Sequence, residues 1–178
     1  VDSVGSIDIG IKIVPEGENL VINLINQNLQ MFSKDWEIDN ANRIVYGNKF
    51  IDISDFVLSD GYRTIFIEDY NNKGIELNLN NFDFLLINGI INYNKIDFAG
   101  EGTVFGRVAN IFDKPQIVAD IQIPEFTLNG VDYGALGIRL DDDSGKTNAT
   151  INLNRVEDEL LLLVNASLDK ESKALDGT

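Results

Sequence analysis

The chain of 178 residues contains no histidine and no cysteine. Without these residues it has no Ser-His-Asp triad, no Cys-His dyad and no zinc site of imidazole and thiolate ligands. Catalysis would have to rest on carboxylates, lysines or tyrosines alone. Because no cysteine is present, disulfide usage favours neither an oxidising nor a reducing compartment. We therefore expect a protein that is not an enzyme and needs neither cofactor nor metal.

Basic residues are scarce as well. The sequence has 14 Lys and Arg against 29 Asp and Glu, which gives a net charge of −15. The basic residues are scattered singly, whereas a phosphate backbone needs a basic stripe. We therefore expect no nucleic-acid partner.

Long apolar runs and a signal peptide are also missing. No stretch of about 18 apolar residues is present, so no membrane-spanning helix is predicted. The chain begins with Val1 and shows no targeting pattern at its start. We expect residues 1–178 to be a single β-repeat segment excised from a larger protein.

Strict alternation of apolar and polar residues dominates what is present, and this period is typical of β-strands. Turn-forming pairs such as Asn71-Asn72 and Asn129-Gly130 separate the alternating segments and predict hairpins. The prediction is an all-β protein of about a dozen strands in a long, curved, mostly antiparallel sheet. The pattern by itself favours a closed sandwich or barrel over an open trough.

One phrase occurs twice in the chain. Residues 51–58 and 121–128 both read Ile-x-Ile-x-acid-Phe-x-Leu, and residues 77–84 carry a weaker copy. The apolar positions change from odd to even numbers within each phrase. Side chains alternate strictly between the faces of a strand, so a bulge or a tight corner is predicted near Ser54-Asp55 and Pro124-Glu125.

Motifs that bind phosphate or metal are weak. Gly100, Gly102 and Gly106 lack the spacing and the following helix of a phosphate loop, so they are interpreted as strand glycines. Residues 141–145, Asp-Asp-Asp-Ser-Gly, do not match a calcium loop and predict a solvated hairpin turn. Asn148-Ala149-Thr150 and Asn165-Ala166-Ser167 match the short glycosylation pattern.

Two longer segments carry a family resemblance. The first segment, residues 36–67, contains Trp-Glu-Ile, then Asn-Arg-Ile-Val-Tyr-Gly, and then Ile-Asp-Ile-Ser-Asp-Phe-Val-Leu followed by Asp-Gly. The second segment, residues 106–140, contains Pro-Gln-Ile-Val-Ala-Asp-Ile, then Phe-Thr-Leu-Asn-Gly, and then Gly-Ala-Leu-Gly-Ile. This pattern resembles the TamB translocation and assembly module family, within the wider AsmA-like group of Gram-negative envelope proteins. The other alternating segments fit the loose β-repeat of that family.

The resemblance implies a fold, a location and partners. Family members are anchored in the inner membrane by an N-terminal helix, which this chain lacks, and cross the periplasm as a curved β-sheet with an apolar inner surface, called a β-taco. The full-length proteins engage an outer-membrane barrel partner of the Omp85 type, support outer-membrane protein assembly and are implicated in phospholipid transport between the membranes. The resemblance therefore moves the expected architecture from a closed sandwich to an open apolar trough.

The expected ligand is a phospholipid whose acyl chains lie in the apolar groove. A second hypothesis is a chaperone that receives an amphipathic β-strand of an outer-membrane client by strand addition. A third is a structural or adhesive β-sandwich with a dry core. The predicted groove lining consists of Ile9, Ile11, Ile65, Ile67, Leu77, Leu79, Ile121, Ile123, Phe126, Leu128, Ile138, Leu140 and Leu153.

Overall fold

The computed structural model describes residues 5–31, 34–85, 97–143, 145–155, 159–172 and 174–177. These residues divide into two compact units. The first comprises Val1–Asn80 with Arg107–Pro115, and the second comprises Asn81–Gly106 with Gln116–Thr178. The expectation that residues 1–178 are one segment of a larger protein stays a prediction.

The first unit is an antiparallel sheet built around one long strand. Its strands are β1 (Gly5–Glu16), β2 (Asn19–Met31), β3 (Lys34–Ile38), β4 (Arg43–Gly47), β5 (Phe50–Ser54), β6 (Phe56–Ser59), β7 (Thr64–Tyr70) and the first part of β8 (Gly74–Asp83). Strand β2 pairs with β1 on one side. On its other side, the two ends of β2 pair with β4 and β3.

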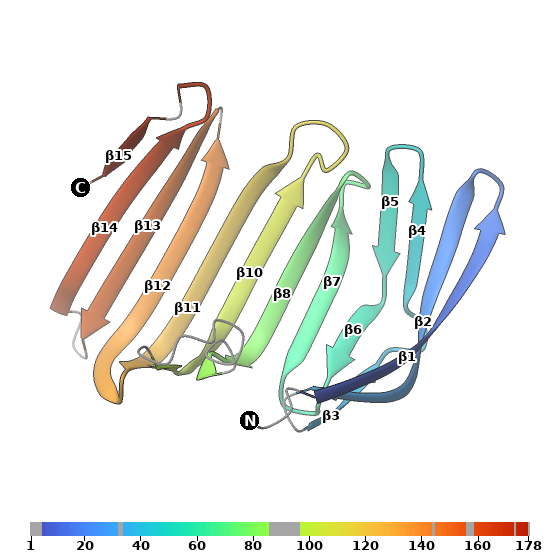
Figure 1. Ribbon diagram of the computed structural model, residues 1–178, viewed down its shortest axis with the longest axis horizontal. Helices are drawn as coiled ribbons and strands as arrows, with labels where there is room; N and C mark the ends of the chain where they lie inside the picture. Colours follow the sequence, from blue (N-terminus) through green and yellow to red (C-terminus); the bar gives the residue numbers. More distant parts are fainter. Residues whose placement is uncertain are drawn as a thin grey trace. The chain divides into compact units, whose positions relative to one another are not determined.

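The second unit is an antiparallel meander. It contains β9 (Phe98–Ala99), most of β10 (Glu101–Ala109), β11 (Gln116–Leu128), β12 (Val131–Asp143), β13 (Lys146–Arg155), β14 (Glu159–Asp169) and β15 (Leu175–Gly177). Figure 1 shows β11 to β14 as neighbouring long strands of alternating direction. The described strands do not close into a barrel in either unit, although β2 branches to three partners and β9 pairs with β11 beside the main order. The prediction of an all-β, antiparallel and open sheet is confirmed.

Tight turns connect the strands where the sequence predicts them. Asn129 and Gly130, between β11 and β12, have φ of 52° and 74°. Asn71 and Asn72, between β7 and β8, have φ of 52° and 55°. Asparagine and glycine tolerate these left-handed conformations, which most other residues avoid. The predicted turn at Asn88-Gly89 lies outside the described residues.

The repeated phrase changes face by two different devices. In the second copy, Ile123 lies opposite Leu136 and Phe126 lies opposite Gly134, so β11 holds one residue more than β12 between these pairs. This is the predicted bulge at Pro124-Glu125. In the first copy, Asp55 has φ of 53° and separates β5 from β6, which is the corner.

Each unit has its own core, and the residues after the change of face contribute to it. In the first unit Leu58 packs in a cluster with Leu29, Trp36 and Ile38. In the second unit Phe126 packs in a cluster with Phe84 and Ile123. The repeated phrase therefore supplies an aromatic or aliphatic core residue just past each break in the alternation.

Strand β14 is exposed along most of its length. Leu160, Leu161, Leu162 and Leu163 have exposed fractions between 41% and 55%. Strand β13 pairs with β14 along one side, whereas β15 pairs only with Ala166–Leu168 on the other. Among the described residues, no strand covers the second side of Glu159–Asn165.

Candidate apolar binding face

One face of the second unit is apolar across four strands. The register of β11 to β14 aligns three cross-strand rows, and residues directly opposite one another in paired strands share a face of the sheet. The rows are Ala119, Leu140, Ala149 and Ala166; Ile121, Ile138, Ile151 and Val164; and Ile123, Leu136, Leu153 and Leu162. We call these three rows the apolar face. They form a continuous surface of methyl and methylene groups.

A cavity of about 170 Å³ lies at one end of the apolar face. Every residue that lines it is apolar: Phe84, Phe98, Ile121, Ile123, Phe126, Leu136 and Ile138. Ile123 and Phe126 are 3% and 7% exposed, whereas Ile121 and Ile138 are only partly buried. The deeper residues therefore hold the fold together, while the shallower ones present apolar surface.

Gly100 lets the chain approach the bulge closely. Its φ is 140°, and a Cβ atom at this position would lie 2.6 Å from both the carbonyl oxygen of Glu125 and the Cγ2 atom of Ile123. Its own carbonyl oxygen accepts a hydrogen bond from the backbone N–H of Phe84, at 2.9 Å. This close approach holds Phe84 and Phe98 beside the bulged part of β11.

Seven of the predicted lining residues lie in the second unit. Ile121, Ile123, Phe126 and Ile138 line the cavity. Leu128 and Leu153 pack against the same core cluster, and Leu140 belongs to the apolar face.

The other six predicted lining residues lie in the first unit. Ile65 is paired with Leu79, and Ile67 with Leu77, across β7 and β8. Ile9 and Ile65 pack against the core cluster of that unit. Ile11 lies on the edge strand β1 and is 64% exposed.

Sequence reasoning missed Phe84, Phe98 and Leu136 as cavity residues. Leu136 alternates with Ile138 and Leu140, and Phe84 ends the weaker copy of the repeated phrase, so both had a usable signal. Phe98 belongs to the two-residue strand β9 and has no alternating neighbours. No periodicity in the sequence marks it.

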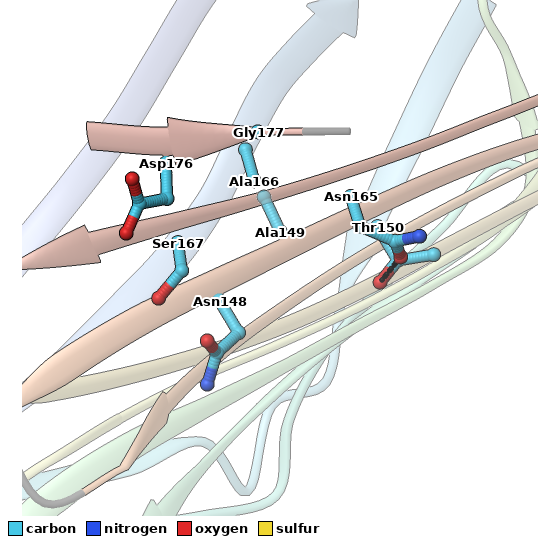
Figure 2. Close-up of a pocket in the computed structure, with 8 residues that line it drawn as sticks. All are labelled: Asn148, Ala149, Thr150, Asn165, Ala166, Ser167, Asp176 and Gly177. Carbon is cyan, nitrogen blue, oxygen red and sulfur yellow. Dashed lines mark hydrogen bonds between the residues drawn. The ribbon is translucent and has the colours of Figure 1, made fainter.

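The opposite face of the same strands is mostly polar, with Leu163 of β14 as an exposed apolar exception opposite Asn152. There Asn148 lies opposite Ser167, Thr150 lies opposite Asn165, and Ser167 lies opposite Asp176. These residues line an open cavity of about 280 Å³ near β15, together with Gly177 and with Ala149 and Ala166 of the apolar face, as Figure 2 shows. The Thr150 hydroxyl donates a hydrogen bond to the Asn165 side-chain oxygen at 3.1 Å. The sheet of the second unit is therefore amphipathic, and both glycosylation-like triplets start on its polar face.

One carboxylate of the acidic run at residues 141–143 is paired within the protein. Asp142 is 8% exposed and forms an ion pair with the Lys170 ammonium. The Ile117 backbone N–H also donates to it, at 3.2 Å. The hydrogen bond from Lys170 lowers the pKa of Asp142, and this effect outweighs burial, which raises it. Asp142 therefore has a structural role in the second unit.

Among the described residues, no group of three or more acidic side chains is placed to hold a metal ion. No helix in the described part of the chain has the length and hydropathy needed to cross a bilayer. Comparison of the chain with protein-family models, with curated proteins and with solved structures gave no match.

Proposed function

We propose that the apolar face of the second unit binds the acyl chains of a phospholipid. The observation that carries this proposal is the alignment of twelve apolar residues in three rows, with a wholly apolar cavity at one end. Each methylene group removed from water contributes about 0.8 kcal/mol, so two acyl chains are held without any specific polar contact. Binding of this kind requires no reaction, cofactor or metal.

The rows also support movement of a bound lipid. Apolar side chains continue from β11 to β14, so an acyl chain could pass from one row to the next without entering water. Together with the resemblance to the TamB family, this supports a wider proposal. In it the chain is part of a periplasmic protein, anchored to the inner membrane, that carries phospholipid to the outer membrane and supports assembly of outer-membrane barrel proteins.

The test is native mass spectrometry with lipid extraction on the full chain, purified without detergent. We expect bound phospholipid in the wild type and its loss in Ile121→Glu, because a carboxylate in the cavity lining opposes burial of an acyl chain. Gln122→Glu is the matched control, since the neighbouring side chain lies on the other face of β11 and is exposed.

Two results would contradict the proposal. One is a wild-type protein that carries no lipid and takes up no fluorescent phospholipid on incubation. The other is equal lipid occupancy in Ile121→Glu and Gln122→Glu. A circular dichroism spectrum of each variant shows whether the β-sheet is retained, and Ile138→Glu tests the same lining from β12 if Ile121→Glu unfolds.

A second candidate function rests on the edge of β14. Its residues Glu159–Asn165 have no described partner on the side away from β13, and their leucines are exposed. An amphipathic β-strand of an outer-membrane client could add to this edge through main-chain hydrogen bonds. Hydrogen exchange with a client peptide would then protect the amides of β14. Leu163→Pro would weaken that protection, because the Asp169 N–H bonds on the β15 side and alternation places the Leu163 N–H on the same, uncovered side, where proline has no N–H group.

A further inference from the structure

Two lysine side chains line one cavity in the first unit. The cavity has a volume of about 210 Å³ and is lined by Lys49, Lys73, Asn110, Phe112 and Asp113. Lys49 lies in the turn between β4 and β5, and Lys73 lies in the turn between β7 and β8. The other three residues belong to the segment that follows β10. Three separate turns therefore build this site.

Backbone hydrogen bonds tie the three turns together. The Ile51 N–H donates to the carbonyl oxygen of Asn72 at 3.0 Å, which joins β5 to the turn that carries Lys73. The Ile111 N–H donates to the carbonyl oxygen of Lys73 at 2.9 Å, which joins that turn to the segment after β10. The backbone of the three turns is thus held together, while the side chains of Lys49 and Lys73 are exposed and reach a ligand from solvent.

The charges at this cavity are unusual for the chain. Lysines outnumber carboxylates by two to one in its lining, although the whole sequence has 29 acidic and 14 basic residues. The basic groups that form ion pairs with carboxylates among the described residues are Arg43, Arg63, Arg107, Arg139 and Lys170. Neither Lys49 nor Lys73 is within ion-pair distance of a described carboxylate. Two lysines and one aspartate give the lining a net positive charge, which favours an anion.

An apolar surface adjoins the lysines. A second cavity of about 390 Å³ shares Lys49 and Phe112 with the first. Its other lining residues are the apolar Leu20 and Tyr46, then Gly47, the polar Asn48 and the acidic Glu18. The rings of Tyr46 and Phe112 lie 6.1 Å apart between their centroids. Leu20 and Tyr46 are 42% and 48% exposed. A ligand held by the lysines would therefore find an apolar surface beside its charged group.

We propose that this site binds the phosphate group of an amphiphile. The ammonium groups of Lys49 and Lys73 hold the phosphate oxygens, because lysine binds phosphate as a mobile point charge. The apolar body of the ligand lies against Leu20, Tyr46 and Phe112. The phosphate belongs to a lipid headgroup or to another phosphate ester that carries an apolar chain. This site lies in the first unit and does not depend on the apolar face of the second unit.

The test uses two probes on the full chain, followed by NMR of the backbone amides. Inorganic phosphate reports on the lysines alone, because it has no acyl chain for an apolar surface. Dodecyl phosphate, kept below its micelle concentration, reports on the lysines and the apolar surface together. We expect both probes to shift the amides of Lys49, Lys73 and Phe112, and dodecyl phosphate to bind more tightly.

Substitutions in the cavity lining should change the phosphate affinity in opposite directions, depending on the charge that is removed. Lys49→Gln and Lys73→Gln should each weaken phosphate binding by about fivefold to tenfold, the effect of one charged hydrogen bond partly screened by solvent. Lys12→Gln, at an exposed position of β1, should leave binding unchanged. Asp113→Asn should strengthen binding, because it removes the carboxylate that opposes the anion.

Several results would overturn the inference. Unchanged phosphate affinity in both Lys49→Gln and Lys73→Gln would remove the anion site. Equal affinity for inorganic phosphate and dodecyl phosphate would remove the role of the apolar surface. Weaker binding in Asp113→Asn would mean that the carboxylate helps the ligand, which an anion site excludes. Because inorganic phosphate carries no acyl chain, none of these results depends on lipid binding at the apolar face.

Discussion

Asn42 is a buried polar residue that joins two parts of the first unit. It is 0% exposed. Its side-chain oxygen accepts from the Leu24 N–H at 2.7 Å, and its amide donates to the carbonyl oxygens of Leu24 and Asp39. The Asn23 side chain donates to its backbone carbonyl oxygen at 2.6 Å. The Asn42 side chain, which lies in the connection between β3 and β4, therefore hydrogen-bonds to the backbone of β2.

Asn42→Ala should lower the free energy of unfolding by about 2–4 kcal/mol, because it leaves the partly buried N–H and C=O of Leu24 without their side-chain partner. Urea denaturation measures this change. Asn40→Ala is the control, since Asn40 lies two residues away in the same connection and is exposed. Equal stability of the two variants would show that the hydrogen bonds of the Asn42 side chain do not stabilise the fold.

Asp142 gives the second unit a pH dependence on the acid side. Its pKa is held below the ordinary value in the folded state, so it stabilises the fold above the unfolded pKa of about 3.9. That contribution is lost as the pH falls through the lower, folded pKa. Asp142→Asn lacks this titration and should lose less stability than the wild type between about pH 5 and pH 2. Urea denaturation across this pH range measures the difference, and parallel curves would contradict the assignment.

Removal of the partner charge should act at neutral pH. Lys170→Met should lower the free energy of unfolding by about 1–2 kcal/mol, because it leaves the Asp142 carboxylate buried with fewer donors while Lys170 is itself partly exposed. Thermal unfolding at neutral pH measures the loss. Lys146→Met, at an exposed position of β13, serves as the control.

At the scale of the strand, the bulge in β11 decides which face Phe126 reaches. Deletion of Glu125 removes the additional residue, so Phe126 and Leu128 move to the polar face. We expect a loss of about 3 kcal/mol or more, comparable with removal of a buried phenylalanine from a core. Differential scanning calorimetry measures it. Insertion of a glycine after Glu171, in the turn between β14 and β15, is the control and should have a small effect.

The two copies of the repeated phrase show which features of the strands can be predicted from the sequence and which cannot. Alternation predicted the strands, and the odd-to-even change predicted that each phrase breaks. The two copies differ at the position of their acidic residue. Asp55 adopts the left-handed region and separates two strands, whereas the equivalent Glu125 does not have a positive φ and lies with Pro124 in a bulge. Both devices were compatible with the pattern, so only the structure separates them.

The candidate site was predictable in part for the same reason. Alternation identifies the residues that share a face of one strand, but it does not show which strands pair. The register of β11 to β14 brings Ile121, Ile138 and Leu153 onto one surface, while Ile65 and Leu79 belong to the other unit. Phe98 reaches the cavity from a two-residue strand that no period could reveal.

At the scale of the whole molecule, acidity opposes the compact state. A net charge of −15 creates self-repulsion that salt screens. We expect the melting temperature of dilute protein to rise by a few degrees from low to physiological ionic strength, since about 1 kcal/mol corresponds to 2–4 °C for a chain of this size. Scanning calorimetry in sodium chloride measures the rise.

A variant with reduced charge is the control for this effect. Glu37→Gln, Glu68→Gln and Glu171→Gln together neutralise three exposed acids. Their triple variant should be more stable at low salt and should gain less from added salt. A salt response identical to that of the wild type would mean that specific ion pairs, rather than the net charge, set the dependence.

The exposed leucines of β14 have a consequence for handling the protein. A run of four leucines and a valine, on a strand with one uncovered side, has the composition of segments that nucleate fibrils. The negative charge of the chain keeps molecules apart and so protects this segment from meeting its own copy. That protection fails near the isoelectric point of about 4.2. Acidic buffers should therefore convert a soluble preparation into ordered aggregates, with β14 as the first strand to pair.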